Sequence, residues 1–193
     1  MLNLAVLLSG TGRTLDNFHE YIEQKGLTAH IRLVVADVEN ALGLTKARRY
    51  GYPAFFARNN ADINAILANY PIDLICLAGY LPLYQPPAIL AKRVINIHPS
   101  LIPAFCGPGF YGHHVHEAVR ARGCLVSGCT VHFADDRYDH GPIICQKAVS
   151  LADHDDADAI AAKVFTAECL AYPEAINRVA ALGVDYFWER CRQ

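Results

Sequence analysis

The stretch VINIHPSLIP, residues 94–103, decides the fold, because it begins as a buried strand and yet contains two polar side chains. Side chains alternate along a strand, so Asn96 and His98 share one face with Val94. Pro99 marks the end of the strand, and the carboxyl end of a strand in an open α/β sheet is where ligands bind. The pair therefore either holds the following loop or stabilises an oxyanion, as an amide donor beside an imidazole can.

Similar apolar runs precede this stretch and alternate with helical patterns. Strands that are apolar on consecutive residues, separated by helices, are typical of a parallel sheet covered on both faces. We expect strands at residues 4–8, 31–36, 73–77 and 94–98, and helices near residues 15–24, 42–50, 63–70 and 87–91. The predicted fold class is α/β, a Rossmann-like, doubly wound and mostly parallel sheet with helices on both faces.

The second half departs from this alternation. Prolines and glycines in residues 101–123 predict a loop that leads into a short helix at 115–122. Two strands at 129–134 and 143–149 and a long helix at 156–181 should follow, with Pro173 a candidate interruption of that helix. The final VDYFWERC, residues 184–191, is a candidate last strand.

Length and composition indicate one globular domain with a small-molecule partner. The chain has 193 residues, 53% of them hydrophobic and 19% charged, which suffices for one well-buried core. Its 17 basic and 19 acidic residues give a net charge of -2, so we expect neither a nucleic-acid nor a membrane partner. The amino terminus reads as a strand, not a signal peptide, so we expect a cytoplasmic protein whose seven cysteines stay reduced.

The segment LLSGTGRTLDN, residues 7–17, contains a glycine turn between a strand and a helix. Gly10 and Gly12 would expose backbone N–H groups at the helix amino terminus, which is an anion cradle. It is neither a full dinucleotide fingerprint nor a Walker A loop. The alternative is a tight turn capped by Thr11 or Thr14, although Arg13 favours a phosphate or carboxylate ligand.

Three further groups of side chains have two interpretations each. Asp139 precedes a strand, where an aspartate is ordinarily a turn former. Glu168 lies within about 40° of Val164 on the long helix, which suits a ligand partner or a salt bridge equally well. The histidines of GHHVHEA, residues 112–118, are candidates for a metal site, but no carboxylate or cysteine completes a ligand set at helical spacing. We therefore expect no metal and a mobile active-site loop instead.

Five motifs in order resemble the phosphoribosylglycinamide formyltransferase family of the folate-dependent formyltransferases. They are LLSGTGRTL at residues 7–15, LAGYLPL at 77–83, NIHPSLIP at 96–103, GCTVHF at 128–133 and YDHGPIICQ at 138–146. The resemblance implies formyl transfer from 10-formyltetrahydrofolate to the amine of glycinamide ribonucleotide in purine biosynthesis. Appended domains distinguish other members of the superfamily, and we expect a single formyltransferase domain over residues 1–193.

The resemblance also implies residue roles. Residues 1–100 would be a Rossmann-like phosphate-binding half, and residues 101–193 would carry the folate and active-site loops, the closing strands and the long helix. The implied catalytic set is Asn96, a protonated His98 and Asp139. The implied acceptor-binding residues are Gly10, Thr11, Gly12, Arg13, Thr14 and Glu168, and the implied folate-binding residues are Gly79, Tyr80, Leu81, Pro82, Leu83, Asp135, Tyr138, His140 and Gly141. The expected assembly is a monomer or a homodimer.

Four positions depart from the pattern of the resembling family. Arg13 and Thr14 replace a Ser-Asn pair, Phe165 stands where a polar residue often helps to hold phosphate, and His140 replaces a small or acidic residue. The departures at Arg13, Thr14 and Phe165 suggest one alternative, which is the same chemistry on another amine. A second alternative, from a different class, is a folate-binding protein without catalysis. The intact Asn96, His98 and Asp139 oppose the second alternative.

Overall fold

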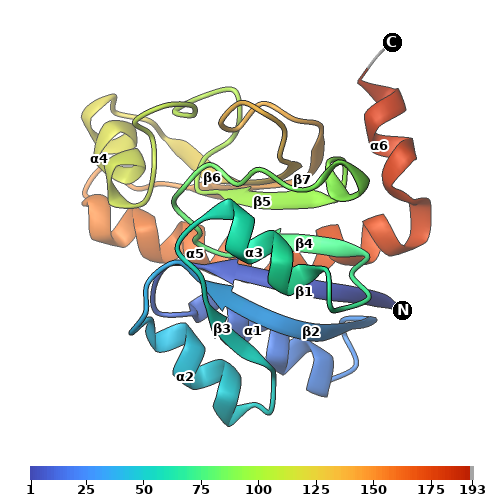
Figure 1. The fold of residues 1–193 in the computed structure, drawn as a ribbon. Coiled ribbons are helices and arrows are strands. Elements are labelled where there is room, and N and C mark those ends of the chain that lie inside the picture. The colour runs from blue at the N-terminus through green and yellow to red at the C-terminus, as the bar shows by residue number, and fades with distance from the viewer. Residues whose placement is uncertain (192–193) are drawn as a thin grey trace. The chain divides into compact units, whose positions relative to one another are not determined.

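The sheet has seven strands in the order β3-β2-β1-β4-β5-β6-β7, with parallel pairs in its first part and an antiparallel pair at its end (Figure 1). This computed structural model describes residues 1–191, so the last two residues of the predicted domain lie outside the described part. The chain divides into two compact units, Met1–Ile95 and Asn96–Gln193, and the division falls within β5 (Val94–His98). The predicted α/β class with a mostly parallel sheet is confirmed.

Unit 1 is built on parallel strands, and all but its edge strand are largely buried. β1 (Leu2–Leu8) pairs with β2 (Ala29–Ala36) on one side and β4 (Leu74–Leu77) on the other, and β3 (Ala54–Phe56) pairs with β2. Residues 4–8 of β1 are fully buried. A strand covered on both faces has no polar side to alternate with, which explains the continuous apolar runs in the sequence.

The helices of unit 1 connect these strands. They are α1 (Arg13–Glu23), α2 (Leu42–Arg49), α3 (Asn60–Leu67) and the short 3-10 helix η1 (Ala88–Leu90). Figure 1 shows α3 on one face of the strands and α1 on the other. Asn59 caps α3 by accepting a hydrogen bond from the backbone N–H of Asp62 at 2.9 Å.

Unit 2 is an antiparallel ribbon packed on a long helix. β6 (Val126–Phe133) pairs with β7 (Ile143–Ser150), and α5 (Ala157–Leu182) packs against both strands. α4 (His113–Ala121) packs on α5, and α6 (Val184–Arg190) ends the described chain. The face of α5 that carries Ile160, Val164 and Ala167 is buried, as its sequence period predicts.

The structure differs from the sequence analysis at three places: the final segment, Pro173 and β3. Val184–Arg190 form α6 and not a strand, because Gly183, at φ 79°, ends α5 and a short helix buries Phe187 against Phe133, with ring centroids 5.7 Å apart. Pro173 does not interrupt α5, since it and its neighbour Tyr172 are buried and their packing outweighs one lost backbone hydrogen bond. The three-residue β3 was not predicted.

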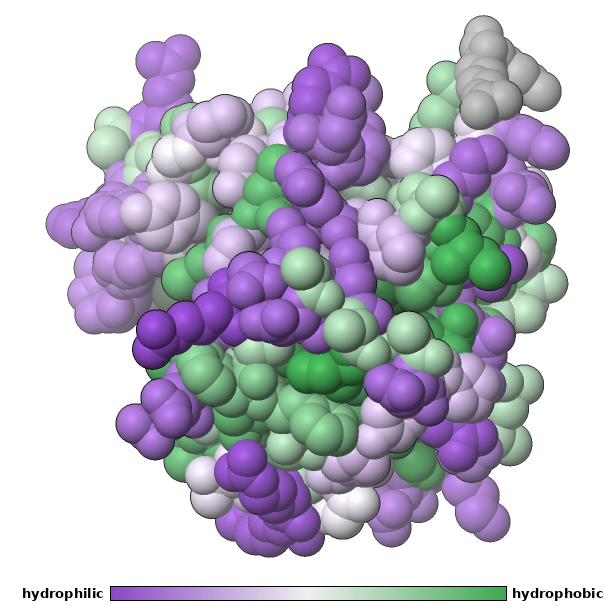
Figure 2. All heavy atoms as spheres, viewed as in Figure 1, coloured by the Kyte–Doolittle hydropathy of each residue, from purple (hydrophilic) through white to green (hydrophobic). Residues whose placement is uncertain are grey.

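Figure 2 shows polar residues over much of the viewed face, with apolar side chains gathered in smaller groups between them. Large apolar side chains that are exposed include Leu81, Ile89 and Leu125. Within residues 1–191, no helix combines the length and the apolar character needed to span a membrane.

The turn at Gly12 depends on the absence of a side chain. Gly12 has φ 73°, and a Cβ at this position would lie 2.8 Å from the Cα of Gly43. The backbone N–H of Gly43 donates to the carbonyl of Gly10 at 3.0 Å, so the turn is fastened to the start of α2. The close approach of two backbones therefore adds a steric requirement to the conformational one.

We expect Gly12→Ala to lower the free energy of unfolding by at least about 2 kcal/mol, because it combines left-handed backbone strain with overpacking. Gly51→Ala is the matched control. Gly51 has φ 81°, and none of the described atoms lies within 4 Å of the place that its Cβ would take. Strain alone should cost it about 1 kcal/mol. Urea unfolding of both variants measures the difference, and equal losses would contradict the steric explanation.

Candidate functional site

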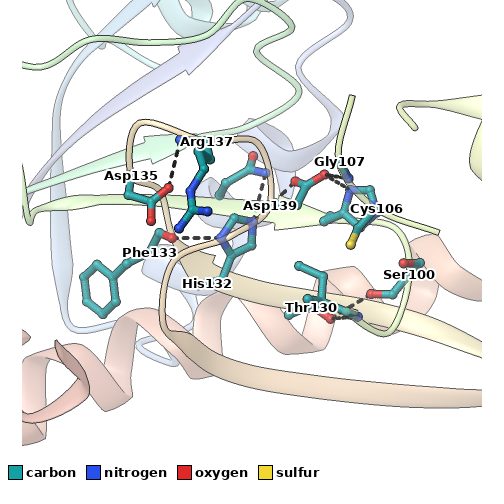
Figure 3. A network of polar contacts seen from close by, with 12 residues as sticks. Ser100, Cys106, Gly107, Thr130, His132, Phe133, Asp135, Arg137 and Asp139 are labelled. Atoms are coloured by element: carbon teal, nitrogen blue, oxygen red, sulfur yellow. Dashed lines mark hydrogen bonds and ion pairs between the residues drawn. The ribbon is translucent and has the colours of Figure 1, made fainter. Parts of the chain in front are cut away.

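The three predicted catalytic residues meet in unit 2. Asn96 and His98 project from the same face of β5, and Asp139 reaches them from the loop between β6 and β7. His98 Nδ1 lies 3.4 Å from Asp139 Oδ2, and both side chains are less than a tenth exposed. Asn96 joins the group through His132, whose Nε2 lies 3.3 Å from Asn96 Nδ2 and 3.6 Å from Asp139 Oδ1. Figure 3 shows His132 directed toward Asp139.

His132 orients the amide of Asn96. Its Nδ1 lies 2.8 Å from the carbonyl oxygen of Phe133, which only accepts, so Nδ1 carries the proton. Nε2 of the neutral ring is then an acceptor, and the group that faces it on Asn96 must be the amide N–H₂. The second N–H of the Asn96 amide does not face His132. No catalytic role was assigned to His132 from the sequence, although Thr130 and His132 repeat the polar spacing of Asn96 and His98 on a buried strand.

The tautomer of His98 is fixed in the same way. Its Nε2 donates to the carbonyl oxygen of Phe105 at 2.8 Å, which leaves Nδ1 toward Asp139. Phe105 has φ 47°, and the loop before it is held by Thr130, which donates to the carbonyl of Ser100 at 2.7 Å and accepts from the N–H of Ile102 at 3.0 Å (Figure 3). A buried hydroxyl on β6 thus places the carbonyl that orients His98.

Burial acts in opposite directions on the pKa values of His98 and Asp139. Burial lowers the pKa of His98, and it does so more strongly than Asp139 and the Phe105 carbonyl raise that pKa. Burial would raise the pKa of Asp139, but the neighbouring His132 and His98 and the N–H of Gly107 together lower it. The Gly107 N–H donates to Asp139 Oδ2 at 2.9 Å. The site therefore holds a stable carboxylate beside an imidazole whose pKa burial lowers, and the protonated His98 of the catalytic set stays a prediction.

The predicted folate-binding residues of unit 2 belong to the same β6–β7 loop. Asp135 accepts hydrogen bonds from the backbone N–H of Arg137 at 2.9 Å and from His140 Nδ1 at 2.6 Å. Tyr138 is exposed. Gly141 lies against β6 so closely that a Cβ would be 2.0 Å from the carbonyl oxygen of Phe133, which explains why this position excludes a side chain.

Unit 1 brings together two other predicted loops. Ser9 accepts a hydrogen bond at its side chain from the N–H of Leu81 at 3.1 Å, and its own N–H donates to the carbonyl of Gly79 at 3.0 Å. The glycine turn (Gly10, Thr11, Gly12, Arg13, Thr14) and the loop Gly79, Tyr80, Leu81, Pro82, Leu83 are thereby joined. Gly12 begins α1, and no side chain within the described residues caps this helix. The turn keeps its backbone N–H groups at a helix amino terminus, as an anion cradle requires.

Glu168 lies on α5, half-buried, at the edge of the apolar face that contacts β6. Its carboxylate is close enough to Cys129 to act on the thiol: burial first, and then the charge of Glu168, raise the pKa of Cys129 to about 12. Phe165 is one turn earlier on the same helix and is also half-buried. The predicted place of Glu168 at the rim of the core is therefore confirmed, whereas its acceptor-binding role stays a prediction.

The three histidines of residues 112–118 have separate surroundings. His113 Nε2 lies 3.8 Å from Asp158, and His114 Nδ1 lies 3.1 Å from Glu117. His116 is 6% exposed, and its Nδ1 has no hydrogen-bond partner among residues 1–191. Burial, and then the nearby His113 and His98, lower the pKa of His116. Within the same residues, no three His, Cys, Asp or Glu side chains are grouped as a metal site would need.

Comparison with known proteins identifies relatives along nearly the whole chain. Residues 2–176 match the family model of formyl transferases. The chain is 33% identical to the phosphoribosylglycinamide formyltransferase of Bacillus subtilis over 95% of its own length and 97% of that protein's. It is 35% identical to the chloroplastic phosphoribosylglycinamide formyltransferase of Vigna unguiculata, of which it spans 59%.

A solved structure supports the same relationship. The glycinamide ribonucleotide transformylase 1 of Symbiobacterium toebii superposes with a TM-score of 0.86 at 34% sequence identity, covering 95% of this chain and 89% of that one. The resemblance inferred from five short motifs is thus confirmed.

We expect the protein to lose stability below about pH 6.5, because burial lowers the pKa of His98 and His116 in the folded state. The unfolded chain then binds protons at two rings that the folded chain leaves neutral, so the free energy of unfolding falls as the pH falls. Each ring contributes at most about 1.4 kcal/mol per pH unit. Urea unfolding at about pH 7.5 and about pH 5.5 measures the loss.

His116→Gln is the control for this pH dependence, because glutamine does not titrate. The variant should lose less stability than the parent between the two pH values. Asp139 does not act in this window, since its lowered pKa makes its contribution disappear only below its ordinary value of 3.8. An identical pH dependence in parent and variant would exclude His116 as a source.

Proposed function

The chain belongs to the formyl transferase family, and from this premise we propose that it transfers the formyl group of 10-formyltetrahydrofolate to the amine of glycinamide ribonucleotide in purine biosynthesis. The observation that carries the proposal is the meeting of Asn96, His98 and Asp139 in unit 2. An amide, an imidazole and a carboxylate supply hydrogen-bond donation and proton transfer, which are the two requirements of amine attack on a formyl carbon.

Asn96 would stabilise the developing negative charge. When the amine attacks, the formyl oxygen becomes an oxyanion and needs a donor that is already in place. One N–H of the Asn96 amide is held by His132 at 3.3 Å, which leaves the other to donate to that oxygen. Because His132 fixes the amide before substrate binds, little reorganisation is needed during the reaction.

His98 and Asp139 would assist proton transfer during the reaction. The bond from Nε2 of His98 to Phe105 leaves Nδ1 as the position that gains a proton, and this atom faces Asp139. An imidazolium, formed when Nδ1 takes up a proton from solvent, would be stabilised by the carboxylate and would add positive charge near the oxyanion. The proton of the attacking amine would pass to the leaving folate nitrogen through a water positioned by Asp139.

The remaining role assignments follow from the resemblance. Gly10 to Thr14 would hold the acceptor's phosphate, Glu168 would contact its glycinamide-ribose part, and Gly79 to Leu83 would hold the folate pterin together with the β6–β7 loop. The bonds through Ser9 support a common arrangement of the two unit 1 loops. The same proposal assigns phosphate binding to residues 1–100, and the folate and active-site loops, the closing strands and the long helix to residues 101–193. It also includes a cytoplasmic location and a monomeric or homodimeric state.

The nearest alternative is the same transfer to a different amine. Arg13, Thr14 and Phe165 favour it, since they alter the charge and polarity available to the acceptor. Incubating the protein with 10-formyltetrahydrofolate and a panel of amines, glycinamide ribonucleotide among them, separates the two. Loss of the formyl group that depends on another amine would replace the acceptor, and no amine-dependent turnover would reject catalysis altogether.

We expect Asn96→Ala and Asp139→Asn each to lower kcat by roughly 10²-fold or more, because one removes an oxyanion donor and the other the charge that supports His98. Steady-state formyl transfer at saturating substrates gives the values. Asp153→Asn, at an exposed carboxylate outside the proposed site, should keep the parental rate. A decrease of less than about threefold in either site variant would contradict its role.

A further inference from the structure

Three residues of the loop between β6 and β7 contact one another on its solvent side, and Figure 3 shows two of them, Asp135 and Arg137. One Arg137 guanidinium nitrogen lies 2.5 Å from His140 Nε2 and 3.0 Å from His140 Nδ1, and Nδ1 lies 2.6 Å from Asp135 Oδ2. The other oxygen of Asp135 accepts from the Arg137 backbone N–H at 2.9 Å. Arg137, His140 and Asp135, here called the loop clamp, therefore form a closed ring.

The Asp135 carboxylate only accepts, so Nδ1 of His140 donates to it. The Arg137 guanidinium lies against the same ring. His140 is thereby held between Asp135 and Arg137.

The loop clamp encloses the residue that delivers the catalytic carboxylate. Asp139 has φ 54°, a left-handed conformation that is uncommon for a residue with a side chain. On its inner side Asp139 has a 2.9 Å bond from the Gly107 N–H and two longer approaches to His98 and His132, at 3.4 and 3.6 Å. The neighbouring residues 135, 137 and 140 are tied to one another from the solvent side, so the backbone on both sides of Asp139 is restrained.

We propose that His140 is a positioning residue, which closes the loop clamp and so holds the Asp139 carboxylate against His98 before substrate binds. This role replaces the direct folate contact predicted for His140, and its catalytic consequence rests on the proposed formyl transfer. A strained conformation at a functional position persists only when its surroundings determine it, and the loop clamp supplies that restraint.

Histidine NMR tests the placement of Asp139 without any turnover. The ring of His98 is followed by pH titration in protein with ¹³C-labelled histidine, and its signal is assigned with His98→Gln. Because the Asp139 charge raises the pKa of His98, loss of the loop clamp should lower that pKa. Asp139→Asn defines the shift for complete loss of the charge, and His140→Ala should move the His98 titration measurably in that direction.

A conservative variant separates the hydrogen bond from the bulk of the ring. The amide of His140→Asn keeps a donor near the position of Nδ1, so the His98 titration should stay closer to the parental curve than in His140→Ala. Arg137→Ala, at an exposed side chain, breaks the ring at another link and should shift the titration in the same direction as His140→Ala. His30→Ala, at an exposed histidine of β2, is the control and should leave the titration unchanged.

Kinetics separate positioning from direct folate binding. If His140 positions Asp139, His140→Ala lowers kcat roughly tenfold with little change in KM for 10-formyltetrahydrofolate, because the misplaced group acts in the transition state. His140→Asn should restore most of that loss. A raised KM with an unchanged kcat and an unmoved His98 titration would overturn the proposal in favour of direct folate contact.

The kinetic and NMR measurements test the proposed function and the role of His140 separately. If the parental protein transfers no formyl group, the function proposed above is wrong, and the NMR titrations still decide whether His140 holds Asp139. If the parent is active and His140→Ala leaves both kcat and the His98 titration at parental values, the loop clamp has no positioning role.

Discussion

The site depends on one carboxylate that two imidazoles share within unit 2. Asp139 lies 3.4 Å from His98 and 3.6 Å from His132, and its side chain is 7% exposed. Each imidazole gives its other nitrogen to a backbone carbonyl, Phe105 for His98 and Phe133 for His132. These two bonds determine which nitrogen faces the carboxylate, and so they determine where protons can be held. The Gly107 N–H donates to this buried carboxylate at 2.9 Å, and a proton gained at His98 Nδ1 would face it.

This arrangement explains how a neutral imidazole beside a carboxylate could support amine attack. Burial keeps His98 neutral in the free protein, while the Asp139 carboxylate stays ready to stabilise an imidazolium once charge develops nearby. The amide of Asn96 is fixed by His132, so the donor does not have to turn during the reaction. The hydrogen-bond donor would therefore be oriented before negative charge develops on the formyl oxygen, as electrostatic stabilisation of a transition state requires. The proposed loop clamp extends the same principle to the backbone that carries Asp139.

Most of the fold followed from hydrophobic periodicity. Strands β1, β2 and β4 of unit 1 and the long α5 were predicted to within a few residues, since buried parallel strands and a one-sided helix leave strong patterns. β3 was missed because three half-buried residues at the edge of unit 1 are too few to show a hydrophobic periodicity. Residues 184–191 were misread because aromatic residues suit strands as well as short helices, and only the packing of Phe187 on Phe133 decides between them.

For the site, the sequence by itself determined that Asn96 and His98 share a face and that a glycine turn presents backbone N–H groups. Family motifs added Asp139. Only the tertiary structure revealed His132 as the link between Asn96 and Asp139, Thr130 as the anchor of the loop that orients His98, and the contacts of His140. The reason is physical: alternation along one strand is a local property, whereas a tautomer or a shifted pKa depends on groups that folding brings from distant segments.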